Sequence, residues 1–575
     1  MSVESLLLLR LRACTDLSSV ARVLGLTPAV LSFVLYKIPT QARYRTFSIA
    51  KRAGGSRAIM APNERLKMVQ RRLASVLLQI QTEQERSRTK KACILSHGFK
   101  RELSILTNAR NHRNKRFVFN LDLEDFFPTF NFGRVRGFFM RDQNFQLHPA
   151  AATVLAQIAC HNNHLPQGSP CSPVISNLLA HMLDLRLNKI ARRHKCTYTR
   201  YADDLTFSTN KKDFPEVIGA TSPGDPNKWS AGNDLLASVY LSGHKINHSK
   251  TRMQYRDSRQ ETTGLVVNRK INVSVDYYKL VRAMCDRLFA SGIAFRQDKN
   301  KIEPVSRSHL QGKLAFIYHI RGQETSHRKL QKKDQPGYYR LYSQFLDYCN
   351  LYDVDRPTII CEGKTDNVYI RSAIEALSSK VPGLLDSEKK LTVRLFKYTK
   401  ITSTIQDLAG GTDQLKKLVR EYANRTQMFK TTPSHPLILV TDVDKGSTEF
   451  FKAVSAILGT TVAGADPFYH LIKNLYVVPV PKIKHPETAI EDLFDDTLLN
   501  EKVDGKSFDR TNKEKDGTKF YGKHVFATRV VWPNRSTINF ARFEPLLRAF
   551  EDVKSHYKTL TSTSVKSPAP IAAAA

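Results

Sequence analysis

The sequence predicts an α+β region followed by an α/β region with a mainly parallel sheet. Its 575 residues exceed what one hydrophobic core normally holds, so two or more domains are expected. The composition changes at Asp353–Pro357, where we place the start of the second region. Beyond this point short apolar segments alternate with helical ones, a pattern typical of parallel strands joined by crossover helices.

The first region mixes helices with short strands. Residues 1–40 are expected to be helical, because apolar residues recur at helical spacing. A further helix is expected over Pro173–Arg193, and a basic helical stretch from about 275 to 350. Residues 210–235 carry Pro, Gly and Asp and predict a surface insertion. The strand candidates are Phe117–Leu123, Tyr198–Thr206 and Thr263–Val267.

The second region has three buried strand candidates. They are Thr358–Cys361, Leu437–Thr441 and Leu475–Val480. The tail Ser567–Ala575 is of low complexity and is expected to be disordered. No apolar run approaches the length that spans a membrane, and the short run Leu6–Leu9 predicts a buried helix. We therefore expect no membrane partner.

The charge of the chain points to a polyanionic partner. The formal net charge is +36 and the pI is about 9.9. Such an excess of Lys and Arg favours nucleic acid, because neutralised phosphates release their counterions. A merely solvated basic surface would have the same composition. The eight cysteines form no CxxC pair, which argues against a zinc knuckle and for a reducing cytoplasm.

Two acidic clusters lie at the ends of strand candidates in the first region. Asp203 and Asp204 stand in the tetrapeptide YADD, where a strand–turn–strand hairpin would present them at its tip. Asp122 ends another apolar segment. Two Mg²⁺ ions require hard oxygen ligands from separate segments, which these aspartates provide. Alone, an acidic pair at a hairpin tip would more simply be a solvated turn.

The surrounding motifs decide between these interpretations. The segment KRAGGSR occupies 51–57, LPQGSP occupies 165–170, and Lys250 follows SGHKIN, which occupies 242–247. In this order around YADD, residues 44–270 resemble reverse transcriptases of the retron and group II intron branch. The resemblance implies a right-hand polymerase of fingers, palm and thumb, with Asp122, Asp203 and Asp204 as catalytic metal ligands.

The same resemblance implies the residues that bind the incoming deoxynucleoside triphosphate. Lys51 and Arg57 correspond to the residues that grip the triphosphate. Phe127 corresponds to the bulky residue that rejects a 2′-hydroxyl, although alone it would be a core aromatic. Lys250 corresponds to a residue that aids proton transfer to pyrophosphate, although alone it would be a surface cation. Gln167 and Gly168 belong to the LPQGSP motif, in which the backbone approaches template and nucleotide.

Two shorter motifs resemble the retron enzymes in particular. NARNH at 108–112 matches their NAxxH, and TTG at 262–264 departs from their VTG at Thr262. The resemblance implies RNA contacts at Asn108, His112, Thr263 and Gly264. It also implies a cognate structured RNA, priming from a guanosine 2′-hydroxyl, and a branched RNA–DNA product (msDNA). Shape and 2′-hydroxyl contacts suit an A-form RNA partner.

A second acidic constellation follows residue 357. Glu362 lies in EGKTD directly after one strand candidate, and Asp442 and Asp444 lie in DVDKG directly after another. The carboxyl ends of parallel strands meet at one edge of a sheet, where such proteins collect their functional groups. Asp442 and Asp444 could share a divalent ion there, and Glu362 could be a further ligand or an acid/base.

This pair of motifs resembles the TOPRIM domain, in the form found in OLD-family nucleases. The resemblance implies catalytic and metal-binding roles for Glu362, Asp442 and Asp444, with Mg²⁺ or Mn²⁺ as the ion. IEDLF at 490–494 adds Glu491 and Asp492 as further candidate ligands, with a helix N-cap as the alternative. Lys519–Lys523 is either a phosphate-binding patch or a solvated basic turn.

The sequence thus predicts a retron reverse transcriptase fused to a TOPRIM nuclease effector in bacterial anti-phage defence. The alternatives are a mobile-element enzyme without a defence role, and a second domain that only scaffolds RNA. The TOPRIM domain would cut DNA or RNA, and a homo-oligomer is possible by analogy. The predicted domains are N-terminal helices and fingers (1–115), palm (116–272), thumb (273–352), TOPRIM domain (353–562) and tail (563–575).

Overall fold

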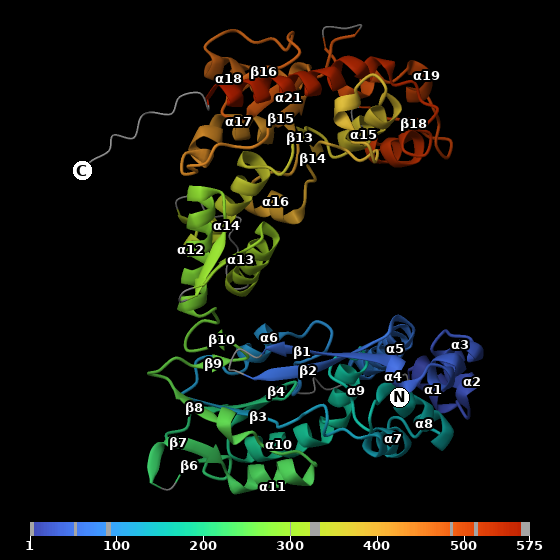
Figure 1. Cartoon of the computed structure of the whole chain (residues 1–575), viewed down its shortest axis with the longest axis vertical. Helices are drawn as coiled ribbons and strands as arrows, with labels where there is room; N and C mark the ends of the chain where they lie inside the picture. Colours follow the sequence, from blue (N-terminus) through green and yellow to red (C-terminus); the bar gives the residue numbers. More distant parts are fainter. Residues whose placement is uncertain are drawn as a thin grey trace. The chain divides into compact units, whose positions relative to one another are not determined.

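The computed structural model describes most of the chain as two compact units. The described residues are 5–50, 55–87, 94–222, 224–298, 301–322, 334–483, 487–510 and 516–564. The units are Met1–Ser274 and Val275–Ala575, and each has its own sheet and core (Figure 1). The predicted disordered tail lies outside the described residues apart from its first two, which end a helix.

The first unit begins with short helices, as the sequence predicts. They are α1 (Leu6–Arg12), α2 (Leu17–Val23), α3 (Pro28–Ser32), η1 (Phe33–Lys37) and α4 (Thr40–Arg43). A hairpin of β1 (Tyr44–Ala50) and β2 (Ser56–Pro62) follows, then α5 (Glu64–Ser87) and α6 (Ile105–Arg110).

A four-stranded antiparallel sheet forms the centre of the first unit, in the order β4-β5-β3-β8. Its strands are β3 (Phe117–Asp122), β4 (Thr197–Tyr201), β5 (Asp204–Thr209) and β8 (Arg252–Tyr255). The helices around it are α7 (Phe132–Arg141), α8 (Pro149–Ala159), α9 (Ser172–Leu179), α10 (His181–Arg193) and α11 (Asn233–Leu241). The predicted helix over 173–193 is therefore two helices, divided at Ala180, where ψ is −2°.

Two small hairpins complete this unit. Strands β6 (Gly219–Ser222) and β7 (Asp225–Ala231) form the predicted insertion. The segment 263–267, expected to be one strand, is instead the turn and second strand of a hairpin of β9 (Glu261–Thr262) and β10 (Leu265–Val266). Thr263 and Gly264 have φ of 49° and 78°, the left-handed pair that a two-residue hairpin turn requires. A short η2 (His248–Lys250) precedes β8.

The second unit starts with helices and a small hairpin. These are α12 (Val275–Ser291), β11 (Phe295–Asp298), β12 (Lys301–Pro304), α13 (Arg307–Gly322), α14 (Gly337–Asp347) and η5 (Tyr348–Tyr352). They pack directly on the region that follows. The amide Nε2 of Gln406 donates to Asp347 at 3.0 Å, and Asn474 Nδ2 donates to the Tyr352 carbonyl at 2.8 Å. The predicted boundary at 352/353 thus falls inside this unit.

The predicted, mainly parallel sheet follows, in the order β14-β13-β15-β17-β16. Its members are β13 (Thr358–Cys361), β14 (Arg394–Leu395), β15 (Leu437–Thr441), β16 (Tyr469–Ile472) and β17 (Leu475–Pro479). All neighbouring pairs are parallel except β16–β17 at the edge.

Helices cover both faces of this sheet (Figure 1). Alternate strand residues face α15 (Asp366–Ala376) and α21 (Glu544–Ser564), and the others face α17 (Thr412–Thr426) and α18 (Thr448–Leu458). The remaining elements are η6 (Pro382–Leu384), α16 (Lys400–Ile405), η7 (Lys445–Ser447), η8 (Ile490–Leu493), α19 (Asp496–Leu499), β18 (Ser507–Phe508), β19 (Phe520–Tyr521), α20 (Lys523–Val525), η9 (Phe526–Val531) and η10 (Ala541–Phe543). This arrangement is a doubly wound α/β layer structure.

Within the described part of the chain, no single helix is long and apolar enough to cross a membrane. One bent pair, Leu17–Val23 with Pro28–Lys37, passes the same test by length and composition.

Candidate active sites

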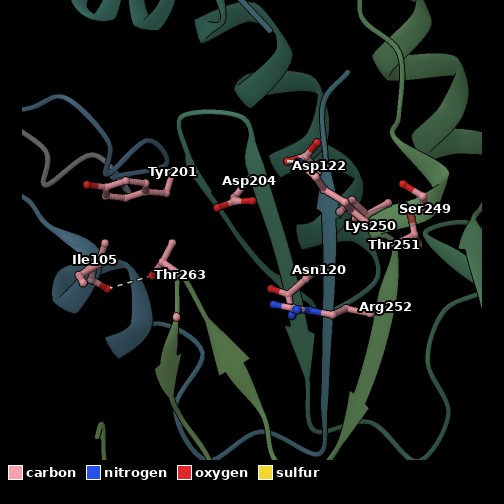
Figure 2. Close-up of a pocket in the computed structure, with 12 residues that line it drawn as sticks. Ile105, Asn120, Asp122, Tyr201, Asp204, Ser249, Lys250, Thr251, Arg252 and Thr263 are labelled. Atoms are coloured by element: carbon pink, nitrogen blue, oxygen red, sulfur yellow. Dashed lines mark hydrogen bonds and ion pairs between the residues drawn. The ribbon is translucent and has the colours of Figure 1, made fainter. Parts of the chain in front are cut away.

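The predicted aspartates of the first unit meet at one end of the central sheet. Asp122 ends β3 and pairs in register with Asp204, the first residue of β5. Asp203 lies in the tight turn between β4 and β5, and its carbonyl accepts from the Leu123 amide at 3.0 Å. Figure 2 shows Asp122 and Asp204 on neighbouring strands, facing one pocket. Two chain segments therefore deliver three carboxylates to the same place.

These carboxylates repel one another. Burial raises the pKa of Asp203, and the charge of Asp122 raises it further. Although Asp204 is open to solvent on one side, the protein around it and the charges of Asp203 and Asp122 raise its pKa to about 6. The ammonium of Lys250 lies 2.8 Å from Asp122 Oδ2 and offsets part of this charge. Such a cluster favours cations.

The donor set fits divalent metal ions that the substrate helps to bind. No group of three or more His, Cys, Asp or Glu side chains in the described ranges forms a ready-made site for one ion. Mg²⁺ commonly takes one or two protein carboxylates and completes its shell with substrate phosphates and water. Asp122, Asp203 and Asp204 supply hard oxygens of that kind.

The candidate triphosphate-binding residues lie on and beside the β1–β2 hairpin. Arg57 is exposed on β2, and its charge opposes the rise in the pKa of Asp203 that burial and Asp122 cause. The Gln167 carbonyl accepts from the Met60 amide of β2 at 2.7 Å. Gly168 has φ of 121°, and a Cβ there would lie 2.6 Å from the Met60 carbonyl. Lys51 lies outside the described residues.

Phe127 is half-buried and packs against two other aromatic rings. Its ring lies 5.4 Å from that of Phe126 and 6.1 Å from that of Phe99, measured between centroids. These two rings fix the aromatic side chain while leaving part of it exposed. That position is compatible with a contact to a bound nucleotide.

A pocket of about 480 Å³ opens beside Asp122 and Asp204 (Figure 2). Thr263 and Gly264 form one wall, and the Thr263 hydroxyl donates to the Ile105 carbonyl at 3.3 Å. Arg252, which the sequence analysis missed, also lines the pocket, and its charge lowers the pKa of Asp204. Thr263 and Gly264 are thus placed where a nucleic acid could reach them.

Asn108 and His112 need a correction, because both side chains are buried. Asn108 is 1% exposed and His112 is 0% exposed. The two His112 ring nitrogens bond to the hydroxyls of Ser208 (2.8 Å) and Thr199 (2.7 Å). Thr199 in turn donates to Asn108 Oδ1 at 2.6 Å. The predicted RNA contact is therefore wrong for these side chains, which bind α6 to the central sheet. The motif gave no signal of their burial.

The second acidic constellation also converges, at the carboxyl ends of β13 and β15. Glu362 directly follows β13 and accepts hydrogen bonds from Thr412 and Thr441. Asp442 directly follows β15, and its Oδ1 accepts from the Ile490 amide at 2.9 Å. Asp444 is exposed, and its Oδ1 accepts from the Ser447 amide at 2.9 Å. The predicted trio thus shares one edge of the sheet.

The structure adds further charged groups to this cluster. Asp366 of EGKTD is 6% exposed and accepts from the Gly363 amide at 2.7 Å. Glu491 is 1% exposed and pairs with Lys523 at 3.0 Å. Burial raises the pKa of Asp442 well above its usual value, and the charges of Glu362, Glu491 and Asp366 add to the shift. Sequence spacing alone did not assign Asp366 or join Lys523 to this site.

Glu491 and Asp492, left open by the sequence, take different positions. Glu491 faces the acidic cluster, where its charge helps to raise the pKa of Asp442 after burial and Glu362. Asp492 accepts from the Ala489 amide at 2.8 Å and pairs with Arg510 at 2.7 Å. The helix-cap interpretation therefore describes Asp492, which caps η8 from its third position, whereas Glu491 faces the second acidic cluster.

Comparisons with known proteins agree with the first site. The family described as reverse transcriptase (RNA-dependent DNA polymerase) matches residues 49–272. The matched range contains the aspartate trio of the first unit and ends before the second acidic cluster. Residues 49–272 of the first unit are thus similar to the reverse transcriptase class.

Curated relatives narrow the class. The retron Ec86 reverse transcriptase of Escherichia coli is 33% identical over 292 residues, covering 50% of this chain and 79% of that protein. The retron Mx65 enzyme of Myxococcus xanthus is 33% identical over 319 residues, covering 52% of this chain. The chain belongs to the retron reverse transcriptase family.

The similarity covers only part of this chain and only part of each relative. The chain spans 66% of the length of the Mx65 enzyme and 65% of the Mx162 enzyme. Among solved structures, telomerase from Candida albicans in complex with a fragment of telomeric RNA aligns with a TM-score of 0.34 and 10% identity, over 68% of each chain. That overlap is too low to carry an argument.

Proposed function

We propose that this chain is an RNA-directed DNA polymerase that copies a cognate structured non-coding RNA into msDNA, primed from a guanosine 2′-hydroxyl. The observation that carries the polymerase activity is the meeting of Asp122, Asp203 and Asp204 at one sheet end, beside a pocket lined by Thr263 and Gly264. Membership of the retron family supports the choice of template, primer and product.

In the proposed reaction the primer hydroxyl loses its proton to water and its oxygen bonds to the α-phosphorus of a deoxynucleoside triphosphate. The bond from that phosphorus to the bridging oxygen breaks, and pyrophosphate leaves. Two Mg²⁺ ions would activate the hydroxyl and offset the charge that develops on the leaving group. Asp122, Asp203 and Asp204 would hold them. Arg57, with Lys51, would bind the triphosphate, and Phe127 would contact its sugar. Lys250 is paired with Asp122 in this structure and would donate a proton to the leaving pyrophosphate.

The double variant Asp203→Asn/Asp204→Asn tests the polymerase assignment. It removes two negative charges and nearly preserves volume. Loss of several kcal/mol of metal stabilisation lowers the rate of DNA synthesis by at least about 100-fold. RNA binding stays largely intact, because Lys and Arg elsewhere make the phosphate contacts. Full-length DNA synthesis by this variant at the parental rate would rule the assignment out.

Nucleic acid that co-purifies with the protein tests the retron part of the proposal. Sequencing should recover one structured RNA joined to DNA through a 2′–5′ branch, and a debranching treatment should separate the two. The Asp203→Asn/Asp204→Asn protein should retain the RNA without the DNA. Unbranched or heterogeneous nucleic acid would instead favour a mobile-element enzyme.

We further infer that residues 353–562 form a TOPRIM nuclease effector for anti-phage defence, restrained by the RNA–DNA product. Support comes from Glu362, Asp442 and Asp444 at one edge of a doubly wound sheet, with raised pKa values for Glu362 and Asp442. Mg²⁺ or Mn²⁺ would relieve this repulsion and activate water towards a phosphodiester of DNA or RNA.

Glu362→Ala tests the effector proposal against an RNA scaffold. In cells challenged with phage, the variant should lose protection while its msDNA level stays unchanged. In vitro, Mn²⁺ should raise the melting temperature of the parent protein and of Asp203→Asn/Asp204→Asn, and raise it less in the Glu362→Ala form of that double variant. Retained protection would favour the scaffold. So would a rise in melting temperature with Mn²⁺ that is equal in Asp203→Asn/Asp204→Asn and in its Glu362→Ala form.

A further inference from the structure

The turn that carries Asp203 has a strained backbone. Ala202, between the last residue of β4 and Asp203, has φ of 57° and is 7% exposed. A residue with a Cβ is uncommon in this left-handed region, and it persists only where its surroundings hold it. Gly98 packs directly against this turn, since a Cβ on Gly98 would lie 2.7 Å from the Ala202 nitrogen.

The buried guanidinium of Arg200 is hydrogen-bonded to the backbone of this turn. Arg200 is 0% exposed, and its Nη1 donates to the Ala202 carbonyl at 3.0 Å. Its Nε and Nη2 donate to the two oxygens of Asp184, at 2.8 and 2.7 Å, in a bidentate pair. Asp184 lies on α10 and is 1% exposed. The peptide unit before Asp203 is therefore tied to a helix through one planar group.

Two more side chains orient this ion pair. The Tyr198 hydroxyl donates to Asp184 Oδ1 at 2.9 Å. Asn177 Oδ1 accepts from Arg200 Nη1 at 3.2 Å, and its Nδ2 donates to the Gly98 carbonyl at 2.6 Å. Arg200 also exchanges backbone hydrogen bonds with the segment 95–97, which lies along β4. The network thus bonds to the backbone of the turn at Ala202 and to the segment packed against it at Gly98.

A network this buried is costly for stability alone. Removing two charges from water carries a large desolvation penalty, and well-packed apolar residues often replace such a pair without loss of stability. What apolar residues cannot replace is the directed bond to the Ala202 carbonyl. That bond fixes the peptide preceding Asp203.

We infer that Arg200, oriented by Asp184, is a positioning residue that sets the place of the Asp203 carboxylate for DNA synthesis. The inference rests on the proposed polymerase function. Misplacing a reacting group by about 1 Å costs on the order of 100-fold in rate. Arg200 is fully buried and bonds to the Ala202 carbonyl, so it would act through the turn and not by contact with nucleotide or template. Its loss therefore lowers kcat and weakens the response to Mg²⁺ while leaving the KM for nucleotide almost unchanged.

The test replaces the network by apolar groups of similar size in the full chain: Arg200→Met with Asp184→Leu and Tyr198→Phe. Primer extension on a defined RNA template measures kcat, KM and the Mg²⁺ concentration for half-maximal rate. We expect an unchanged melting temperature, kcat lower by about 100-fold, KM for nucleotide within about threefold, and a raised Mg²⁺ requirement. A folded triple variant with parental kcat and Mg²⁺ requirement overturns the inference.

A second variant tests the positioning role of Arg200 if the triple variant does not fold. Arg200→Lys keeps the charge beside Asp184, but an ammonium lacks the planar fork needed to reach Asp184 and the Ala202 carbonyl together. It should lower kcat about tenfold at unchanged KM, and parental kcat overturns the inference. The control is Glu544→Gln, which weakens the Lys380–Glu544 ion pair of the second unit, outside the predicted thumb, and should leave kcat unchanged. A parent that makes no DNA rejects the polymerase function itself.

Discussion

Thr262 has a buried hydroxyl without a hydrogen-bond partner among the described residues. The residue is 0% exposed, and its Oγ1 is unpaired. An unpaired buried hydroxyl costs about 1–3 kcal/mol, whereas a methyl group of the same shape costs nothing in lost hydrogen bonds. Thr262→Val should therefore stabilise the first unit by about 1 kcal/mol, and it restores the VTG form of the motif.

The two tryptophans allow this stability to be measured. Trp229 lies in the first unit and Trp532 in the second. In a Trp532→Phe background the fluorescence of Trp229 reports unfolding of the first unit in urea. A lower urea midpoint for Thr262→Val would show that the hydroxyl has a partner in solution.

The buried His112 makes the first unit sensitive to acid. Burial lowers its pKa from 6.5 to about 3. Between these values the unfolded chain binds a proton that the folded chain excludes, so stability falls as pH drops below about 6.5. One proton contributes up to about 1.4 kcal/mol per pH unit. His97 (about 4) and His244 (about 3) act in the same direction.

His112→Gln should flatten this dependence, because an amide bonds Ser208 and Thr199 without titrating. Urea midpoints followed by Trp229 at pH 5 and pH 7.5 measure the change. The expected result is a smaller difference between the two pH values in the variant than in the parent. An unchanged difference would mean that His112 titrates normally in the folded protein.

For single residues, the sequence predicts a role only where a short motif contains the residue. Asp203 and Asp204 are adjacent and carry their own signal. Arg200 and Asp184 lie 16 positions apart, and nothing in either position indicates that they pair. His112 does lie in a motif, but the motif specifies only which residue is present and does not indicate whether its side chain is buried.

Gly168 packs directly against β2 of the β1–β2 hairpin. Its φ of 121° is closed to residues with a Cβ, and the added atom of Gly168→Ala would lie 2.6 Å from the Met60 carbonyl. The hairpin, which carries Arg57, must then shift. We expect a KM for nucleotide raised about tenfold or more and a stability loss of about 1–3 kcal/mol. Steady-state primer extension measures the first effect.

Gly137 provides the control for this substitution. It lies in α7, and a Cβ there would meet nothing within 4 Å. Gly137→Ala should leave KM unchanged and stabilise the helix by up to about 1 kcal/mol. Equal KM values for the two variants would show that the β2 contact does not position the hairpin.

Elements were predictable where the apolar pattern was strong. Thr358–Cys361 and Leu437–Thr441 are strands with the predicted bounds, because each is a buried apolar run. Thr263–Val267 looks equally strand-like, but the left-handed Thr263 and Gly264 reverse the chain. Such a turn is rare for a β-branched residue, so propensity gave no warning of it.

On the scale of the whole molecule, the second unit does not divide at residue 352. Leu351 is 0% exposed and belongs to the same core as Leu415 and Leu439. The rings of Phe289 and Phe429 lie 5.2 Å apart. A truncated protein ending at residue 352 exposes Leu351 and Phe289, so we expect it to aggregate. Size-exclusion chromatography with light scattering provides the measurement.

The matched truncation ends at residue 274, between the two compact units. It should remain monodisperse and unfold in a single transition followed by Trp229. A monodisperse 1–352 protein with helices α12, α13 and α14 folded would contradict the expectation. It would show that those helices pack without the region that follows.

The pairing of distant strands sets the order in which the chain can fold on the ribosome. The central sheet of the first unit closes when β8 reaches β3, that is, once Tyr255 has been made. The parallel sheet cannot close until Pro479 of β17 pairs with Thr441. At roughly 5–20 residues per second, tens of seconds separate these events. The central sheet that carries Asp122 and Asp204 is thus complete while the strands of the parallel sheet are still being synthesised.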